Sequence, residues 1–264
     1  MRRKLVVGNW KMNGNLLQNK ALISAYLQEL QGLGEADFAV CVPYTYLFQA
    51  QQLLSGTAIK WGSQNVSQFL EGAYTSSISA SMIAEFGCSY AIVGHSERRY
   101  LSHESNEKAA IRVTRAVNTG ITPIYCVGET QLERQAGHAK KIVEAQVLAI
   151  CNLPHVDFEH AKAVNMVIAY EPVWAIGTGQ AASAEDAQEM HSFIRVLFAL
   201  RDEEFAKKVR IIYGGSLTPT NACALLTMPD IDGGLIGRSA LNAVSFGQIA
   251  KIACNTGACL VDTE

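Results

Sequence analysis

Short runs rich in Val, Ile and Tyr recur along the chain, each followed by a polar or glycine-containing turn and then a segment with helical spacing. Most runs are apolar nearly throughout rather than alternating, which is typical of parallel strands that are covered on both faces. The runs predict eight strands, at residues 4–9, 38–42, 59–65, 90–93, 121–127, 165–170, 209–213 and 231–236.

The segments between these runs carry apolar side chains that recur on one helical face. Residues 16–31 form one such predicted helix, and Ser183 with Asp186 resembles a capping box at the start of another. No Pro/Ser-rich linker and no block of charge divides the chain. The eight strand and helix units therefore predict an α/β fold with one domain, residues 1–264, as a single closed (β/α)8 barrel. A doubly wound open sheet is the alternative.

Composition narrows the class of ligand. Of the 264 residues, 49% are hydrophobic, which is enough for a large core, and the formal net charge is -2. This charge provides no broad attraction for nucleic acid or an anionic membrane, and no stretch is long enough to span a bilayer. We therefore expect a small-molecule partner. The seven cysteines are odd in number and scattered, a pattern typical of reduced thiols in the cytoplasm.

In a barrel of this kind the chemistry lies at the carboxyl ends of the strands, so the polar residues just past each run are the candidates. These are Asn9, Lys11, His95, Cys126, Glu129, Glu171, Gly214, Gly215, Ser216 and Gly237. The set combines a base, an imidazole, an ammonium group and several backbone amides, which suits a carbonyl compound that carries a phosphate group.

Glu171 by itself has the features of an exposed carboxylate at a strand end. Its neighbours favour a catalytic base instead, because Pro172 restricts the backbone and residues 173–176 form an apolar segment poorly suited to open water. A loop that closes over the site would bury this segment and desolvate Glu171. Desolvation would make it a stronger base than a free carboxylate, whose pKa is about 4.3.

His95 and Lys11 are each open to an ordinary interpretation as structural or solvated side chains. His95, however, follows a predicted buried strand at a point where a helix can begin, and a helix N-terminus disfavours the charged imidazolium. A neutral imidazole can donate a hydrogen bond to a carbonyl oxygen and stabilise an enediolate. Lys11 lies just past the first strand in a turn rich in Gly and Asn, from which it can supply a fixed positive charge.

The turns after the last three strands are rich in glycine, and such turns commonly place backbone amides around a phosphate group. The sequence has neither a P-loop nor a dinucleotide fingerprint after a strand, so we expect no nucleotide cofactor. The six histidines show no metal-ligand spacing, so we expect no metal either. Cys126 has no evident base partner, and we interpret it as a buried packing thiol.

Six motifs resemble those of the triosephosphate isomerase family, in that family's order: GNWKMNG (8–14), VGHSERR (93–99), CVGET (126–130), AYEPVWAIGTG (169–179), YGGS (213–216) and DGGLIG (232–237). The resemblance extends essentially end to end. It implies a TIM barrel that interconverts dihydroxyacetone phosphate and glyceraldehyde 3-phosphate without a cofactor, in glycolysis and gluconeogenesis. Two alternatives are another phosphosugar barrel enzyme, such as an aldolase, and a non-catalytic phosphate-binding scaffold that kept the fold.

The resemblance also implies a role for each matching residue. Glu171 would move a proton between two substrate carbons, and His95 would move protons at the oxygens. Lys11 would stabilise negative charge, and Asn9 would shape the pocket. The substrate phosphate would be bound by the backbone amides of Gly177, Ser216, Gly237 and Arg238. The lid, residues 172–182, would contain Pro172, Val173, Trp174, Ala175, Ile176, Thr178 and Gly179, latched by Tyr213, Ser216 and Glu129.

A homodimer is a further implication, with Thr75 reaching toward Asn9 and His95 of the partner subunit. Three positions depart from the family's usual pattern. Arg238 stands where glycine is usual, next to a phosphate-binding amide. Ser76-Ser77 replaces a glycine-containing pair in the loop that contacts the partner, and Gln180-Ala181 ends the lid where a basic residue is more usual. These departures bear on phosphate binding, dimer strength and the rate of lid closure.

Overall fold

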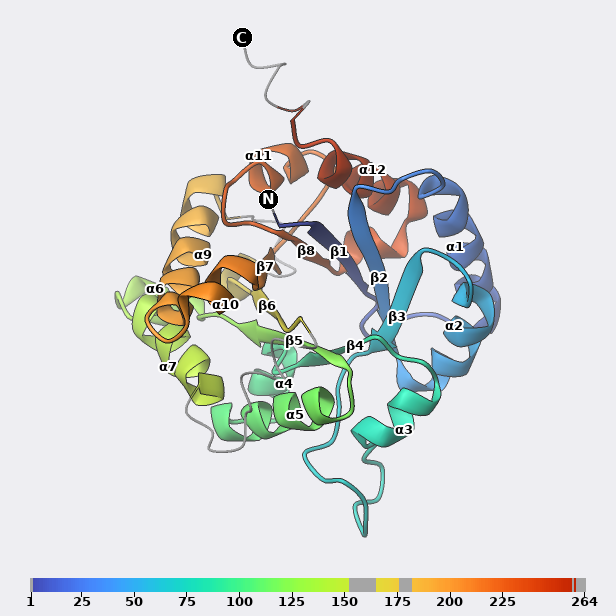
Figure 1. Ribbon diagram of the computed structural model, residues 1–264, viewed down its shortest axis with the longest axis horizontal. Helices are drawn as coiled ribbons and strands as arrows, with labels where there is room; N and C mark the ends of the chain where they lie inside the picture. Colours follow the sequence, from blue (N-terminus) through green and yellow to red (C-terminus); the bar gives the residue numbers. More distant parts are fainter. Residues whose placement is uncertain (1, 152–164, 176–181, 258, 260–264) are drawn as a thin grey trace.

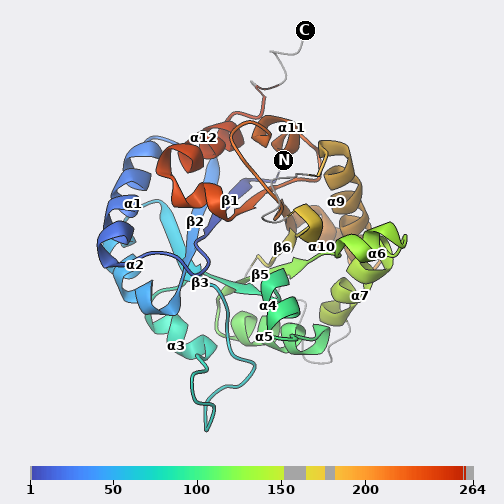
Figure 2. The same cartoon turned by 180° about the vertical axis from the view of Figure 1, so that it is seen from behind.

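The computed structural model describes residues 2–151, 165–175, 182–257 and 259. Eight parallel strands follow one another in sequence order around a closed barrel, and a ring of helices surrounds them (Figures 1 and 2). The strands are β1 (Lys4–Asn9), β2 (Ala36–Val42), β3 (Ile59–Ser63), β4 (Tyr90–Val93), β5 (Thr122–Val127), β6 (Val167–Tyr170), β7 (Arg210–Tyr213) and β8 (Gly233–Ile236). The predicted barrel is confirmed. The open-sheet alternative is wrong, because β8 pairs with β1 and closes the sheet.

Helices connect the strands and cover the outside of the barrel (Figure 1). The α-helices are α1 (Leu16–Glu29), α2 (Leu47–Leu54), α3 (Ala80–Glu85), α4 (Ser96–Leu101), α5 (Asn106–Asn118), α6 (Gln131–Gln135), α7 (Ala139–Cys151), α9 (Ala184–Ala199), α10 (Glu203–Lys208), α11 (Ala222–Leu226) and α12 (Ala243–Cys254). The short 3-10 helices are η1 (Tyr44–Tyr46), η2 (Val173–Ala175) and η3 (Arg238–Leu241). Among the described residues, no helix is both long enough and apolar enough to cross a bilayer.

Two layers of apolar side chains account for the nearly continuous hydrophobicity of the strands. Because side chains alternate along a strand, every second residue points into the barrel and the others point toward the helices. The interior layer consists of Leu5, Val7, Ala39, Cys41, Tyr90, Ile92, Ile124, Cys126, Val167, Ala169, Ile212 and Leu235. A larger layer between strands and helices includes Val6, which is fully buried between its interior neighbours in the sequence. Both faces of the sheet are therefore buried, as the sequence predicts.

The predicted boundaries are accurate where a turn follows the strand directly and less so elsewhere. β1 and β4 match their predicted ranges. β3 ends at Ser63, before its predicted end at residue 65, and the Ser63 hydroxyl donates to the carbonyl of Asn65 in a local turn. β6 begins at Val167, because Asn165 has φ 52°, a left-handed conformation that does not continue a strand. The predicted cap of α9 is present, with Ser183 accepting from the Asp186 amide at 3.0 Å.

The cysteines depart in one respect from the expected reduced thiols. Cys41, Cys88, Cys126, Cys151 and Cys254 are free, and four of them are buried. Cys223 on α11, however, is joined in a disulfide to Cys259, with 5.9 Å between their Cα atoms. The expectation is therefore wrong for this pair. Nothing in their spacing of 36 residues reveals it, because only the fold brings Cys259 against α11.

Candidate active site

A cavity of about 470 Å³ opens at the carboxyl ends of the strands. Its lining brings together nine of the predicted site residues: Asn9, Lys11, His95, Glu171, Gly214, Gly215, Ser216, Gly237 and Arg238. Residues from β1, β4, β6, β7 and β8 meet here because the carboxyl ends of all parallel strands lie at the same end of a closed barrel.

Glu171 follows β6 directly, and its backbone amide donates to the Val127 carbonyl at 2.7 Å. The side chain is only 2% exposed. Oε2 accepts a hydrogen bond from the Ser96 amide at 2.8 Å, and Oε1 lies 2.9 Å from Nε2 of His95. Oε1 nevertheless receives no directed hydrogen bond from any described residue, so this oxygen of a buried carboxylate is able to accept a proton.

The ionisation of Glu171 reflects opposing effects. Burial raises the pKa of Glu171, but the contact with His95 and the hydrogen bond from Ser96 lower it by more, so the pKa lies below its usual value. In this conformation the carboxylate is charged and a weak base. Losing its contacts with His95 and Ser96 while staying buried would raise its pKa.

Two glycines provide the space that Glu171 occupies. A Cβ on Gly128 would lie 1.8 Å from the Glu171 carbonyl oxygen, and one on Gly214 would lie 2.8 Å from its Cγ. Neither distance is compatible with a side chain. These positions therefore require glycine because of close approach to the base, and not because of an unusual backbone angle.

His95 lies where the sequence predicts a helix start. It is the N-cap of α4, and its Nδ1 accepts a hydrogen bond from the Glu97 amide at 3.2 Å. Protonating Nδ1 would break this bond, so we assign the ring one proton, on Nε2, which faces Glu171. Burial lowers the pKa of His95, but the contact with Glu171 raises it by more, so the pKa lies above its usual value while the two side chains touch. The sequence predicts a neutral imidazole at this helix start. In the structure, the hydrogen bond from the Glu97 amide to Nδ1 is the contact that favours the neutral ring.

Lys11 is held in an unusual backbone conformation, with φ 52°. Asn9 Oδ1 accepts from its amide at 3.0 Å, and the side chain of Gln64 donates to its carbonyl at 2.9 Å. The ammonium group lies 2.6 Å from Oε1 of Glu97. Lys11 is therefore fixed at both its backbone and its charged end, and its Cε would lie 3.3 Å from a Cβ placed on Gly237.

Unpaired backbone amides line the opposite side of the cavity. Gly237 is the N-cap of η3, whose first amides receive no side-chain cap. Within the described part of the chain, the amides of Ser216, Gly237 and Arg238 donate no hydrogen bond to another residue. Arg238 is exposed. Amides at a helix start, beside a cationic side chain, provide the geometry expected for binding an anionic group.

The two ends of the expected lid each contact a predicted latch residue. Trp174 Nε1 donates to Oε1 of the fully buried Glu129 at 2.9 Å, and the Ala182 amide donates to the Tyr213 hydroxyl at 3.2 Å. Pro172, Val173 and Ala175 lie in the same segment, with the last two in η2. Ile176, Gly177, Thr178, Gly179 and Gln180-Ala181 lie outside the described residues.

Three contacts of the site were not anticipated from the sequence: the Ser96 amide on Glu171, Glu97 between His95 and Lys11, and Gln64 on Lys11. Ser96 and Glu97 follow His95 directly, so the expected helix start could have suggested their amides. Gln64 carries no such signal. Cys126 is fully buried, and burial raises the pKa of its thiol well above the usual value, which agrees with a packing role. The described residues contain no group of three or more potential metal ligands.

Comparisons with known proteins agree with the motifs and the geometry. The family described as "Triosephosphate isomerase" matches residues 4–253. The triosephosphate isomerase of Thiobacillus denitrificans is 48% identical over 253 residues, which cover 96% of this chain and 99% of that protein. Those of Nitrosomonas eutropha and Cupriavidus necator are 47% and 46% identical, covering 94% and 95% of this chain and 97% and 100% of their own lengths. This chain therefore belongs to the triosephosphate isomerase family.

Proposed function

We propose that this chain interconverts dihydroxyacetone phosphate and D-glyceraldehyde 3-phosphate through an enediolate, without a cofactor. The observation that carries the proposal is the contact between Glu171 Oε1 and His95 Nε2, at 2.9 Å, in a cavity lined by unpaired amides. A base, a hydrogen-bond donor and an anion site are thus within reach of one small phosphorylated carbonyl compound. The activity belongs to glycolysis and gluconeogenesis, and we expect the protein to act in the cytoplasm.

Proton transfer is assigned to Glu171 and His95. Glu171 removes a proton from C1 of dihydroxyacetone phosphate and returns it to C2, which changes the ketose to the aldose. His95 donates from Nε2 to the carbonyl oxygen and moves a proton between O1 and O2, so that the reaction conserves atoms and charge. Lys11, with its ammonium group fixed by Glu97, stabilises the negative charge of the enediolate, and Asn9 orients the turn that carries Lys11.

Substrate binding would activate the base. A ligand between Glu171 and His95 separates the two side chains and ends the contacts that lower the pKa of the carboxyl group. Burial, which raises this pKa, remains. The carboxylate that is a weak base in the free enzyme thereby becomes a stronger one in the complex.

The phosphate group is assigned to the amides of Gly177, Ser216, Gly237 and Arg238, with the Arg238 side chain adding a charge. Supporting this, Arg238 lines the cavity, is exposed and has no ion pair among the described residues. We expect Arg238→Gly to raise KM several-fold and to weaken its dependence on salt concentration. An unchanged KM with unchanged salt dependence would show that the side chain does not act on the phosphate.

Residues 172–182 are assigned as the lid that excludes water from the enediolate. In support, Glu129 and Tyr213 contact the segment at Trp174 and Ala182, on either side of the residues that are not described. Closure would break these two hydrogen bonds and form others to the closed lid, including one with Ser216. An apolar cover such as Val173 and Trp174 favours this role, because water would otherwise reach a reactive intermediate.

We also propose a homodimer. The loop between β3 and α3 projects from the barrel (Figure 1), and Thr75, which belongs to this loop, is exposed. Large exposed apolar side chains occur on this loop and on the segments after β1, β2 and β3: Met12, Leu16, Leu17, Phe48, Leu70, Tyr74 and Met82. Burying them against a second copy of the chain would remove apolar surface from water. Sedimentation analysis should give a dimer for the wild type and a weaker one for Thr75→Arg.

A coupled assay with glyceraldehyde 3-phosphate, comparing the wild type with Glu171→Gln, tests the function. Glutamine keeps the shape of the side chain and removes the base, so we expect kcat to fall by roughly 10³- to 10⁴-fold with the fold retained. Glu189→Gln, an equal change at an exposed position on α9, should leave kcat unchanged. A folded wild-type protein that binds a phosphorylated substrate analogue without turnover would overturn the proposal and favour a scaffold.

A further inference from the structure

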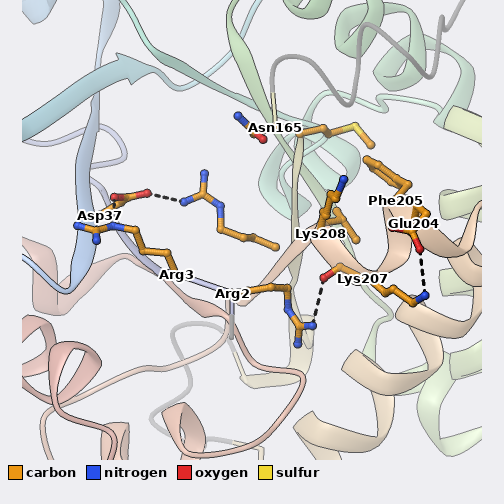
Figure 3. A pocket seen from close by; sticks show the side chains of 11 residues that line it. Arg2, Arg3, Asp37, Asn165, Glu204, Phe205, Lys207 and Lys208 are labelled. Atoms are coloured by element: carbon orange, nitrogen blue, oxygen red, sulfur yellow. Dashed lines mark hydrogen bonds and ion pairs between the residues drawn. The ribbon is translucent and has the colours of Figure 1, made fainter.

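A second and larger cavity, of about 910 Å³, lies at the amino ends of β1, β2, β6 and β7, opposite the candidate active site (Figure 3). Its lining includes Arg2 and Arg3 before β1, Asp37 on β2 and Arg210 on β7. No described residue lines both cavities. The amino-end pocket, as we call it, is therefore a separate site and not an extension of the first.

Positive charge is concentrated in the amino-end pocket. Among the residues that the structure describes, five cationic side chains line it: Arg2, Arg3, Lys207, Lys208 and Arg210. The carboxylates in this described lining are Asp37 and Glu204. Because the whole chain carries a formal net charge of -2, this excess of cations is local.

The available carboxylates neutralise these cations only in part. Arg2 is paired with Asp232, at 2.7 Å from its Nε, but the other cations are less fully compensated. Asp37 is shared by two guanidinium groups, with Nε of Arg3 at 2.5 Å and Nη1 of Arg210 at 2.8 Å. Lys207 pairs with Glu203 and Glu204. Lys208 is exposed and has no hydrogen bond or ion pair with any residue that the structure describes. The pocket thus retains one free ammonium group and a half-compensated pair of guanidinium groups.

The cations form two groups that face each other across the pocket. Figure 3 shows Arg3 and Asp37 on one side and Lys207 and Lys208 on the other, with Arg2 between them. A chain of linked phosphates carries several oxyanions, so it offers a partner to each of the two groups of cations. Guanidinium groups favour such oxyanions because they donate two parallel hydrogen bonds, and the volume is within the range of small-molecule sites.

From this arrangement we propose that the amino-end pocket binds a small polyanion with linked phosphate groups, either inorganic polyphosphate or a nucleoside triphosphate. No glycine-rich phosphate motif takes part, so side chains supply the recognition. Because the pocket lies at the opposite end of the barrel, a bound polyanion stabilises the folded protein without competing with substrate.

The test is calorimetric titration of the whole protein at low salt with tripolyphosphate, with a metal-free nucleoside triphosphate and with inorganic phosphate. We expect tripolyphosphate to bind at least tenfold more tightly than inorganic phosphate. Lys208→Glu should weaken tripolyphosphate binding at least tenfold, whereas Lys141→Glu, an equal charge reversal at an exposed position on α7, should change it less than twofold. Both variants should retain the kcat of the wild type.

The two sources of linked phosphates are separated by their relative affinities. Equal binding of tripolyphosphate and the nucleoside triphosphate assigns the inorganic chain, and tighter binding of the nucleoside triphosphate assigns a nucleotide; either result supports the proposal. The proposal is overturned if no phosphate chain binds, if the two charge reversals weaken binding equally, or if saturating glycerol 3-phosphate, which resembles the substrate, displaces tripolyphosphate. Lys208→Gln serves as the milder variant if Lys208→Glu does not fold.

Discussion

The two ends of the barrel use buried carboxylates in opposite ways. Glu171 at the carboxyl end and Asp232 at the amino end are each about 2% exposed. One oxygen of Glu171 accepts from a single amide, and the other lies against an imidazole without a directed hydrogen bond. Asp232 accepts from Nε of Arg2 and Nη2 of Arg195, each at 2.7 Å, and from the Ile211 amide at 2.9 Å.

This difference shows that burial alone does not determine whether a charged group has a structural or a catalytic role. A carboxylate between two guanidinium groups and an amide cannot lose its partners without leaving charge buried and unpaired. A carboxylate held by one amide and a neutral ring can exchange these contacts for substrate. The carboxyl end is therefore built for changing contacts, and the amino end is built for permanent ones.

Removing the charge of Asp232 is the strongest test of this contrast. Asp232→Asn leaves Arg2 and Arg195 with only the more exposed Asp230 as counter-charge, so the free energy of unfolding should fall by about 3 kcal/mol. The kcat of the folded fraction should remain that of the wild type. Urea denaturation and the coupled assay measure the two quantities. A loss below about 1 kcal/mol, or a large fall in kcat, would contradict the division between the two ends.

Lowering the pH tests the region between the ends, where His191 on α9 is fully buried. Its ring packs edge-on against Tyr170, and Nδ1 lies 3.2 Å from the Asp230 carbonyl near the amino end. Burial lowers the pKa of His191 to about 4, so the unfolded chain binds a proton at a pH where the folded protein does not. Its contribution to stability is complete above about pH 6.5 and is lost as the pH falls toward 4, a change on the order of 3 kcal/mol.

The measurement is the free energy of unfolding of the wild type and of His191→Gln between pH 7 and pH 4. The difference between the two proteins should shrink or reverse as the pH falls, because only the wild type has this buried imidazole to protonate. His138→Gln, at an exposed position, should leave the pH dependence of the wild type unchanged. Parallel curves for wild type and His191→Gln would exclude the buried histidine as the cause.

The local sequence predicts the main residues at the carboxyl end of the barrel well, because the residues next to them in the sequence indicate their roles. Glu171 is marked by Pro172 and the apolar segment after it, and His95 is marked by the buried strand before it. All eight strands were predicted for the same reason, since burial on both faces gives a continuous apolar run. The helix start after His95 could suggest a free Ser96 amide, but not that Glu171 accepts from it, because that contact joins residues 75 positions apart.

The contacts at the amino end of the barrel cannot be predicted from the local sequence in this way. Arg2 and Asp232 are 230 positions apart and meet only because β8 pairs with β1 and closes the barrel. Arg210 and Asp37 are 173 positions apart. Charged residues before a strand carry no local signal that distinguishes an ion pair from a solvated side chain. The need for glycine at position 128 is hidden likewise, since it arises from contact with Glu171.

A methyl group beside the base should cost activity more than stability. In Gly214→Ala the new Cβ would lie 2.8 Å from Cγ of Glu171, so the carboxylate must move from its position. We expect kcat to fall on the order of a hundredfold, because small misplacements of a catalytic group have effects of this size. Gly34→Ala, at the amino end, places its Cβ where no atom lies within 4 Å, and it should leave kcat unchanged. Equal kcat values for both variants would show that Glu171 tolerates displacement.

The smallest expected effects concern two residues that have the same unusual backbone angle and lie at opposite ends of the barrel. Lys11 and Asn165 both have φ 52°. The carbonyl of Lys11 accepts from Gln64, so Gln64→Leu should free the turn and lower kcat/KM about tenfold, the equivalent of one or two hydrogen bonds. Asn165 is exposed and of a residue type that tolerates this angle, so Asn165→Gly should change the free energy of unfolding by only a few tenths of a kcal/mol. Steady-state kinetics and urea denaturation of both variants measure these two effects. If Gln64→Leu leaves kcat/KM intact, the end of β1 alone sets the position of Lys11. The carboxyl end of the barrel would then hold its charged groups less rigidly than its hydrogen bonds indicate.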